Sequence, residues 1–206
     1  DVTGLPGFSQ IETGNGLQIG AAVSWTSIAE ARLPRALHAL QQAARQIGGR
    51  QVQNAGTIGG NLCNASPAAD GVPPLLALDA EVELVSGRGR RRLPLSHFLL
   101  GPRRTALNVG EVLAAVLIPE ASLAGQSGFV KLGARSHLVI SIAMVAARLV
   151  VIEGRVDQAA VAVGSCSPVA VRLPQVEAAL QGAMVGEAVA RIRAEDIQAE
   201  IAPIDD

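Results

Sequence analysis

A glycine-rich stretch between residues 53 and 70 constrains this chain more than any other part of its sequence. It reads QNAGTIGGNLCNASPAAD and combines three glycines and a proline with a closing carboxylate, Asp70. This mixture favours a loop over a regular helix or strand. Glycine lets the backbone come close to a ligand, and successive N–H groups in a tight turn can hold an anion such as phosphate. Asp70 could then accept hydrogen bonds from sugar hydroxyls, so the stretch predicts a loop for a nucleotide cofactor.

The residues alone leave a second interpretation open, because most glycine-rich loops are only turns. The stretch matches neither the Rossmann fingerprint G-x-G-x-x-G nor the P-loop pattern G-x-x-x-x-G-K-[ST]. On physical chemistry alone, it is a candidate anion-binding loop and nothing more specific.

Length and composition exclude several classes of protein. The 206 residues suffice for one large domain or two small ones with real cores. A net charge of −1 gives no electrostatic basis for binding nucleic acid or an anionic membrane. No apolar run reaches the roughly 20 residues that a membrane-spanning helix needs. The two cysteines, Cys63 and Cys166, form neither a disulfide framework nor a C-x-x-C metal pattern. We therefore expect reduced thiols and a cytoplasmic protein.

Local patterns predict helices and antiparallel hairpins around this stretch. Apolar residues at spacings of three and four predict a helix over residues 34–47, which leads into the glycine-rich stretch. An N-G turn near residue 15 predicts one hairpin. Alternating apolar residues predict a second hairpin across residues 81–95 and a third across residues 140–164. We interpret residues 120–128 as a linker and place a domain boundary near residue 125.

Charged residues cluster in the second predicted hairpin. The four arginines between residues 88 and 92 could form a phosphate clamp, but we favour a solvated hairpin tip because exposed basic turns are common. Glu81 and Glu83 alternate along the strand and are expected to face solvent together. The sequence contains no pattern typical of a catalytic acid, base or nucleophile, and no metal-ligating cluster.

The run from Asn54 to Asp79 closely resembles the flavin-binding subunit of the xanthine dehydrogenase family, the molybdenum hydroxylases, to which the medium subunit of carbon monoxide dehydrogenase is related. The motifs T-I-G-G-N at residues 57–61 and S-P-x-x-D at residues 66–70 carry this resemblance, which extends to both ends of the chain. It implies that both motifs touch FAD, that a leucine packs on the cofactor, and that a lysine lies near the flavin. The implied FAD contacts are Thr57, Ile58, Gly59, Gly60, Asn61, Ser66, Asp70, Leu113 and Lys131.

The resemblance also implies an α+β fold in two domains. Residues 1–125 would form the second α/β subdomain of an FAD-binding domain of the cresol-methylhydroxylase type. Residues 126–206 would form the C-terminal domain, an antiparallel sheet with helices. In the family, an N-terminal subdomain carries a further loop of A-G-G-T-D type that holds the pyrophosphate. No such motif occurs in this chain, so we expect the chain to lack that subdomain.

The function implied by the resemblance is electron transfer. In such enzymes a molybdopterin-binding large subunit hydroxylates the substrate, and a small subunit relays the electrons through 2Fe-2S clusters. The FAD subunit passes them to NAD⁺, oxygen or another acceptor. We therefore expect an FAD-dependent oxidoreductase subunit in a cytoplasmic hetero-oligomer, in which the flavin performs the chemistry and the protein positions it. A flavin-free assembly module that docks to the molybdenum and iron–sulfur subunits is the alternative.

Overall fold

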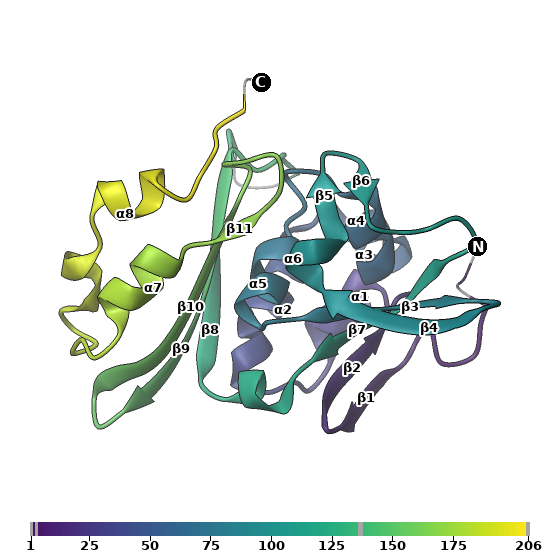
Figure 1. Ribbon diagram of the computed structural model, residues 1–206, viewed down its shortest axis with the longest axis horizontal. Helices are drawn as coiled ribbons and strands as arrows, with labels where there is room; N and C mark the ends of the chain where they lie inside the picture. The colour runs from purple at the N-terminus through teal and green to yellow at the C-terminus, as the bar shows by residue number, and fades with distance from the viewer. Residues whose placement is uncertain (1, 3, 136–137, 205–206) are drawn as a thin grey trace.

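The computed structural model describes residue 2, residues 4–135 and residues 138–204, and it confirms the predicted α+β class (Figure 1). A first unit, from β1 to the short helix η2, lies beside a second unit, from β8 to α8. The first unit contains a five-stranded antiparallel sheet in the order β1-β2-β7-β3-β4. Its strands are β1 (Ile11–Gly14), β2 (Gly16–Gly20), β3 (Glu81–Ser86), β4 (Gly89–Pro94) and β7 (Val112–Ile118).

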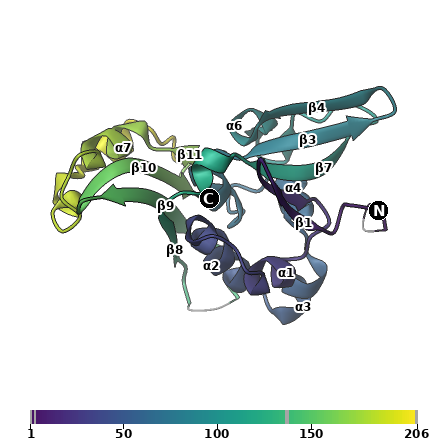
Figure 2. The same ribbon diagram turned by 90° about the horizontal axis from the view of Figure 1, so that it is seen from below.

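The hairpins of this sheet confirm the sequence patterns. β1 pairs with β2 around Asn15, and β3 pairs with β4 around the predicted glycine turn. β7 is a nearly continuous apolar run, VLAAVLI, and it lies in the middle of the sheet between β2 and β3. Strands with this composition are typical of sheets that are covered on both faces. β4 lies at the edge of the sheet (Figure 2), and its residues Arg90 and Arg92 are exposed.

The helices of the first unit include one correction to the sequence analysis. The predicted helix is present as a 3-10 turn, η1 (Arg35–Leu37), followed by α2 (His38–Gln46). The glycine-rich stretch was expected to be a loop but is largely helical, because it contains the end of α3 (Arg50–Ala55) and all of α4 (Ile58–Asn64). The remaining elements of this unit are α1 (Trp25–Glu30), α5 (Val72–Ala77), α6 (Leu95–Phe98), β5 (Leu99–Gly101), β6 (Arg104–Thr105) and η2 (Glu120–Leu123).

The second unit is a four-stranded antiparallel sheet in the order β11-β10-β9-β8, with helices on one face. Its elements are β8 (Gln126–Leu132), β9 (Ala143–Ile152), β10 (Arg155–Gly164), β11 (Val171–Arg172), α7 (Pro174–Leu180), η3 (Ala188–Arg191) and α8 (Ala194–Gln198). α7 covers one face, while α2 and α5 of the first unit lie against the other face (Figure 1). The expected linker over residues 120–128 is wrong at its end, because β8 begins at Gln126.

Small side chains dominate the apolar contact between the two units. This cluster joins α2 and α5 to β8, β9 and β10, and it consists of Ala39, Ala43, Ala77, Phe129, Met144, Ala146 and Ala160. The main core, by contrast, contains large side chains such as Trp25, Phe98 and Leu40. Among the described residues, no helix has both the length and the apolar character needed to cross a membrane.

Burial corrects the expectation for one of the two strand carboxylates. Glu83 is buried, and its oxygens accept hydrogen bonds from Arg90 and Arg92 across the hairpin. Arg91 pairs instead with Glu111. Three of the four clustered arginines therefore have carboxylate partners, which favours the solvated hairpin over a phosphate clamp.

Candidate functional site

Thr57 begins α4 and sets the geometry of the T-I-G-G-N motif. Its backbone is extended, and its hydroxyl oxygen accepts a hydrogen bond from the amide of Gly60 at 3.0 Å. This is the usual arrangement of a threonine N-cap. The side chain of Ile58, the next residue, is fully buried in the main core. The motif therefore forms the N-terminus of a helix that is anchored in the core of the first unit.

The backbone donors of this motif are already engaged inside the protein. Four consecutive amides donate hydrogen bonds of 2.9–3.0 Å: Ile58 to the Val23 carbonyl, Gly59 to the Ala21 carbonyl, Gly60 to the Thr57 hydroxyl and Asn61 to the Thr57 carbonyl. A phosphate could bind these amides only by displacing such partners. The expected phosphate-cradling loop is therefore wrong for this conformation, and the motif offers a surface rather than a nest of free N–H groups.

The two glycines of the motif face different environments. A Cβ atom on Gly59 would lie 2.7 Å from both the Cβ and the carbonyl oxygen of Ala21, so no side chain fits there. Gly60 is exposed, and a Cβ atom there would meet only the Thr57 hydroxyl oxygen, at 3.1 Å. Gly59 thus lets α4 pack closely on the chain after β2, whereas Gly60 leaves the outer backbone open to a ligand.

Asn61 supplies a polar atom that the protein leaves unsatisfied. Its side-chain oxygen is buried and accepts no hydrogen bond from any described residue. A Cβ atom on Gly71 would lie 3.0 Å from this oxygen and 2.5 Å from the indole ring of Trp25, so Gly71 allows the close packing here. Buried polar atoms in native proteins nearly always have a partner. An ordered water or a bound group would complete this one, which fits a nucleotide cofactor at the motif.

Asp70, directly before Gly71, takes part in a buried ion pair between the two units. Its carboxylate accepts a hydrogen bond from the Lys131 ammonium at 2.6 Å and one from the Ser141 hydroxyl at 2.5 Å. The side chains of Asp70 and Lys131 are each only 7% exposed. Lys131 is also the only lysine among the 17 basic residues of the chain. The pair brings together two residues that are 61 positions apart.

A cleft of about 380 Å³ opens beside Lys131. Arg45 and Arg135 contribute positive charge to its wall, and Leu132 and Leu138 contribute apolar surface. A larger cleft, of about 540 Å³, lies at the β1–β2 hairpin and contains none of the predicted contact residues. We assign the candidate site to the Lys131 side of the molecule, because Lys131 lines this cleft and binds the predicted contact residue Asp70, whereas the larger cleft offers no such group.

The remaining predicted residues, Ser66 and Leu113, differ in accessibility. Ser66 is half-buried, and its hydroxyl oxygen accepts a hydrogen bond from the amide of Ala68. Leu113 is buried in β7, opposite Leu84 of β3, in the sheet that packs against α4. The side chains of Ile58 and Leu113 therefore belong to the core in this conformation, and their contact with a cofactor stays a prediction.

Ser141 is the site residue that the sequence analysis missed. It stands in the apolar run VISIAM and is buried. A single hydroxyl inside an apolar run was the available signal, because a buried polar group requires a hydrogen-bond partner. Nothing in the local sequence shows that this partner is Asp70, since the contact spans 71 positions.

Comparison with known families divides the chain into two matches. Residues 1–121 match the family described as the FAD binding domain in molybdopterin dehydrogenase. Residues 129–206 match the family described as the CO dehydrogenase flavoprotein C-terminal domain. Together the two matches cover both units of the fold.

Individual relatives agree with these matches. The chain is 33% identical over 202 residues to a putative xanthine dehydrogenase FAD-binding subunit of Escherichia coli strain K12, covering 97% of the chain and 68% of that protein. It is 41% identical over 132 residues to the nicotinate dehydrogenase FAD-subunit of Eubacterium barkeri, covering 62% of the chain and 45% of that protein. A solved structure of carbon monoxide dehydrogenase from Hydrogenophaga pseudoflava superposes with a TM-score of 0.87 at 30% identity, over 98% of this chain and 70% of the other.

Proposed function

Because this chain belongs to the family of FAD-binding subunits of the molybdenum hydroxylases, we propose that it forms part of an FAD site and takes part in electron transfer. One observation carries the proposal: Asp70, which binds Lys131 in a buried pair, directly precedes Gly71, and Gly71 packs against the unsatisfied side-chain oxygen of Asn61 in the T-I-G-G-N motif. When bound, FAD supplies the ability to accept and release electrons, which protein side chains lack.

Each residue has a role in this proposal that follows from its environment. Gly60 permits close approach of the cofactor to α4. Asn61 offers an acceptor that needs a donor, and Thr57 fixes the first turn of the helix that presents it. Asp70 and Ser141 hold the Lys131 ammonium in place at the cleft. Ile58, Gly59, Ser66 and Leu113 complete the proposed set, mainly by shaping the surface beneath the cofactor.

We further propose the partners and the arrangement of the intact enzyme. The relatives are named as subunits, so the family works in hetero-oligomers. The proposed partners are a molybdopterin-binding large subunit and a small subunit with 2Fe-2S clusters, in the cytoplasm. NAD⁺ or another acceptor would take the electrons. We place the domain boundary near residue 125, between the two family matches.

One observation favours a second candidate function. The amides of the T-I-G-G-N motif are all engaged, so this part of the chain offers no free cradle for the two phosphates of FAD. A chain that binds no flavin would instead act as an assembly module that docks to the molybdenum and iron–sulfur subunits. The two functions differ in a direct measurement, namely flavin affinity.

The test is a titration of the purified chain with FAD, followed by flavin fluorescence. The informative variants are Gly60→Ala, which adds a methyl group to the proposed contact surface, and Gly186→Ala, a control at an exposed glycine with open space around it. We expect Gly60→Ala to weaken binding by about tenfold, equivalent to about 1.4 kcal/mol, and Gly186→Ala to change nothing. Equal affinity of both variants and the parent chain would contradict the proposed contact surface. No binding by the parent chain would favour the assembly module.

A further inference from the structure

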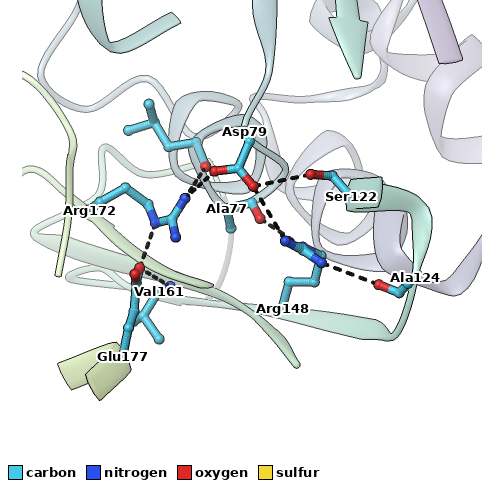
Figure 3. Close-up of polar contacts among 9 residues, drawn as sticks. Ala77, Asp79, Ser122, Ala124, Arg148, Val161, Arg172 and Glu177 are labelled. Atoms are coloured by element: carbon cyan, nitrogen blue, oxygen red, sulfur yellow. Dashed lines mark hydrogen bonds and ion pairs between the residues drawn. The ribbon is translucent and has the colours of Figure 1, made fainter. Parts of the chain in front are cut away.

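A second group of charges crosses between the two units at the far end of α5, with Asp79 at its centre (Figure 3). Asp79 follows α5 and has a left-handed backbone, with φ of 51°. Its Oδ1 accepts a hydrogen bond from Arg172 at 2.6 Å, and its Oδ2 accepts bonds from Ser122 at 3.1 Å and Arg148 at 3.4 Å. Ser122 belongs to the first unit, whereas the two arginines come from β11 and β9 of the second.

The two arginines also bind the C-terminal end of α5. Arg148 donates to the carbonyl of Ala77 at 2.9 Å, and Arg172 donates to the carbonyl of Leu76 at 3.0 Å. The last carbonyls of a helix have no partners within it and carry partial negative charge, so cations are favoured there. The second unit therefore supplies a cap for a helix of the first unit. Burial lowers the pKa of Arg148, but an arginine stays charged in proteins.

The guanidinium group of Arg172 also binds a carboxylate of the second unit. Its Nε donates to Glu177 of α7 at 2.5 Å, and the same carboxylate oxygen accepts a hydrogen bond from the amide of Val161 at 2.8 Å. Arg172 thus links Asp79 to both the sheet and α7 of the second unit. Arg148 has a side chain only 6% exposed, and it reaches the carbonyl of Ala124 as well, at 3.4 Å. The network therefore connects the end of α5, Ser122 and Ala124 to strands β9 and β11 and helix α7 of the second unit.

The apolar contact between the units consists mostly of small side chains. Five of its seven buried residues are alanines, which bury little area and present no shape that interlocks with a neighbour. Directional contacts must then fix how α5 lies on the sheet. Such contacts exist on both sides of α5, since Asp70 binds Lys131 before the helix and Asp79 binds the arginines after it.

We propose that Asp79 is a positioning residue: it locks α5 onto the second unit and thereby holds the Lys131 ammonium against Asp70 at the candidate site. The lock acts through the strands, because Arg148 and the neighbour of Lys131 across the sheet, Met144, lie on the same strand, β9. The role of the Lys131 ammonium toward flavin rests on the proposed function. The contact that Asp79 makes between α5 and the second unit does not depend on that function, and it is measured without flavin.

The single lysine makes the lock measurable. Reductive methylation of the chain modifies only the Lys131 amine and the α-amino group, and peptide mass spectrometry separates the two. The variant is Asp79→Asn, because asparagine tolerates the left-handed backbone and removes only the charge. The matched control is Asp157→Asn, because Asp157 lies in the same cleft as Asp79 and Arg172 and its side chain has no hydrogen bond or ion pair to any described residue.

We expect Asp79→Asn to speed methylation of Lys131 about tenfold relative to the α-amino group, through local opening of the contact between the units. Asp157→Asn should leave the ratio unchanged. If Asp79→Asn fails to fold, Arg172→Gln breaks the same contact from the other side and should also raise the ratio. The proposal would be overturned if the methylation ratio of a folded variant stays at the parent value. It would also be overturned if the rise in the ratio is no larger than the increase in global unfolding measured in the same buffer. Faster methylation with unchanged FAD affinity would support the lock and remove the flavin role of Lys131.

Discussion

The two carboxylates that flank α5, Asp70 and Asp79, both bind basic side chains of the second unit, but they differ in burial and in their partners. Asp70 and Lys131 are each 7% exposed, and among the described residues the carboxylate has two partners, both side chains. Asp79 is 52% exposed and shares its oxygens among Ser122 and two arginines, which also bind backbone carbonyls. The first arrangement fixes one ammonium at one point. The second distributes the contact between the units over many bonds.

This difference has an energetic consequence. A buried ion pair must repay the desolvation of both charges, so loss of one partner leaves an uncompensated charge in a dry place. A half-exposed carboxylate can regain water when a partner is lost. A single substitution in the Asp70 pair should therefore lower the free energy of unfolding strongly. A single substitution in the Asp79 network should lower it less, because the remaining groups keep other partners or regain water. The position of Asp70 beside the candidate FAD site indicates that placement of one charge, rather than stability, is what the pair provides.

The largest effect should come from Lys131→Met, which breaks the buried pair and leaves Ser141 as the one partner of the Asp70 carboxylate among the described residues. We expect a loss of about 3–5 kcal/mol in the free energy of unfolding, measured by urea denaturation at neutral pH. The double variant Asp70→Asn/Lys131→Met removes both charges and should recover a large part of this loss. If the double variant is as unstable as Lys131→Met, the cost arises from lost packing and the pair is not the reason.

The next effect is a difference in stability between substitutions at the two glycines of the T-I-G-G-N motif. Gly59→Ala places a methyl group 2.7 Å from Ala21, deep in the first unit, and overpacking of this kind costs about 1–3 kcal/mol. Gly60→Ala, one residue later on the open face, should change the free energy of unfolding by less than about 1 kcal/mol. The higher helix propensity of alanine stabilises the variant, and the close contact with the Thr57 hydroxyl oxygen offsets part of this gain. Urea denaturation measures both.

Gly59→Ala also serves as a control for Asp79→Asn. Below the urea concentration at which it unfolds, Gly59→Ala should leave the methylation ratio of Lys131 at the parent value, because the atoms that the added methyl group meets belong to Ala21 and to neither end of α5. A raised ratio in this variant would mean that any loss of stability frees the amine, and the comparison between the two ends would lose its meaning.

A smaller effect should appear in the coupling between Asp79 and Arg172. In a double-mutant cycle with Asp79→Asn and Arg172→Gln, we expect a coupling energy of about 0.5–1 kcal/mol, because the carboxylate is half exposed. The corresponding cycle at Asp70 and Lys131 should give a coupling at least twice as large. Equal couplings at the two ends would contradict the distinction between a buried pair and an open network.

The sequence predicted those parts of the molecule that depend on local patterns. The hairpins around residue 15 and residue 88, and the helix that contains Leu40 and Ala44, follow from turn chemistry and apolar spacing. α4 was missed because glycine disfavours helices. The close approach of Ala21, which requires Gly59, is visible only once the chain has folded.

The candidate site was predictable in its residues but not in its contacts. The resemblance carried by T-I-G-G-N and S-P-x-x-D singled out the segment, and the match over residues 1–121 confirms the family, while the FAD contacts of these residues stay a prediction. The partners of Asp70 lie more than 60 positions away, so no local pattern links them. The burial of Glu83 was missed for a related reason, since Arg92 stands opposite it only after the hairpin has formed.

The smallest effect should come from a partly exposed ion pair of the first unit, which serves as a reference for both ends of α5; the side chain of Arg91 is 39% exposed and that of Glu111 is 11% exposed. Arg91 binds both oxygens of Glu111, each at 2.7 Å. The hydrogen bond from Arg91, followed by that from the Asn108 backbone, lowers the pKa of Glu111 to about 2. A carboxyl group whose pKa is lower in the folded state stabilises the protein above its unfolded pKa, near 4.3, and this contribution is lost as the pH falls toward 2.

Glu111→Gln should therefore reduce the free energy of unfolding slightly at pH 7, and the difference from the parent chain should shrink as the pH falls from about 5 to about 2. Because the Arg91 side chain is 39% exposed, 0.5 M salt should weaken this difference as well. Urea denaturation over the pH series measures it, and Glu153→Gln, at an exposed turn, is the control that should show no such trend. If Glu111→Gln proves as costly as Lys131→Met and insensitive to salt, exposure does not govern the strength of ion pairs in this protein, and the contrast between Asp70 and Asp79 needs another explanation.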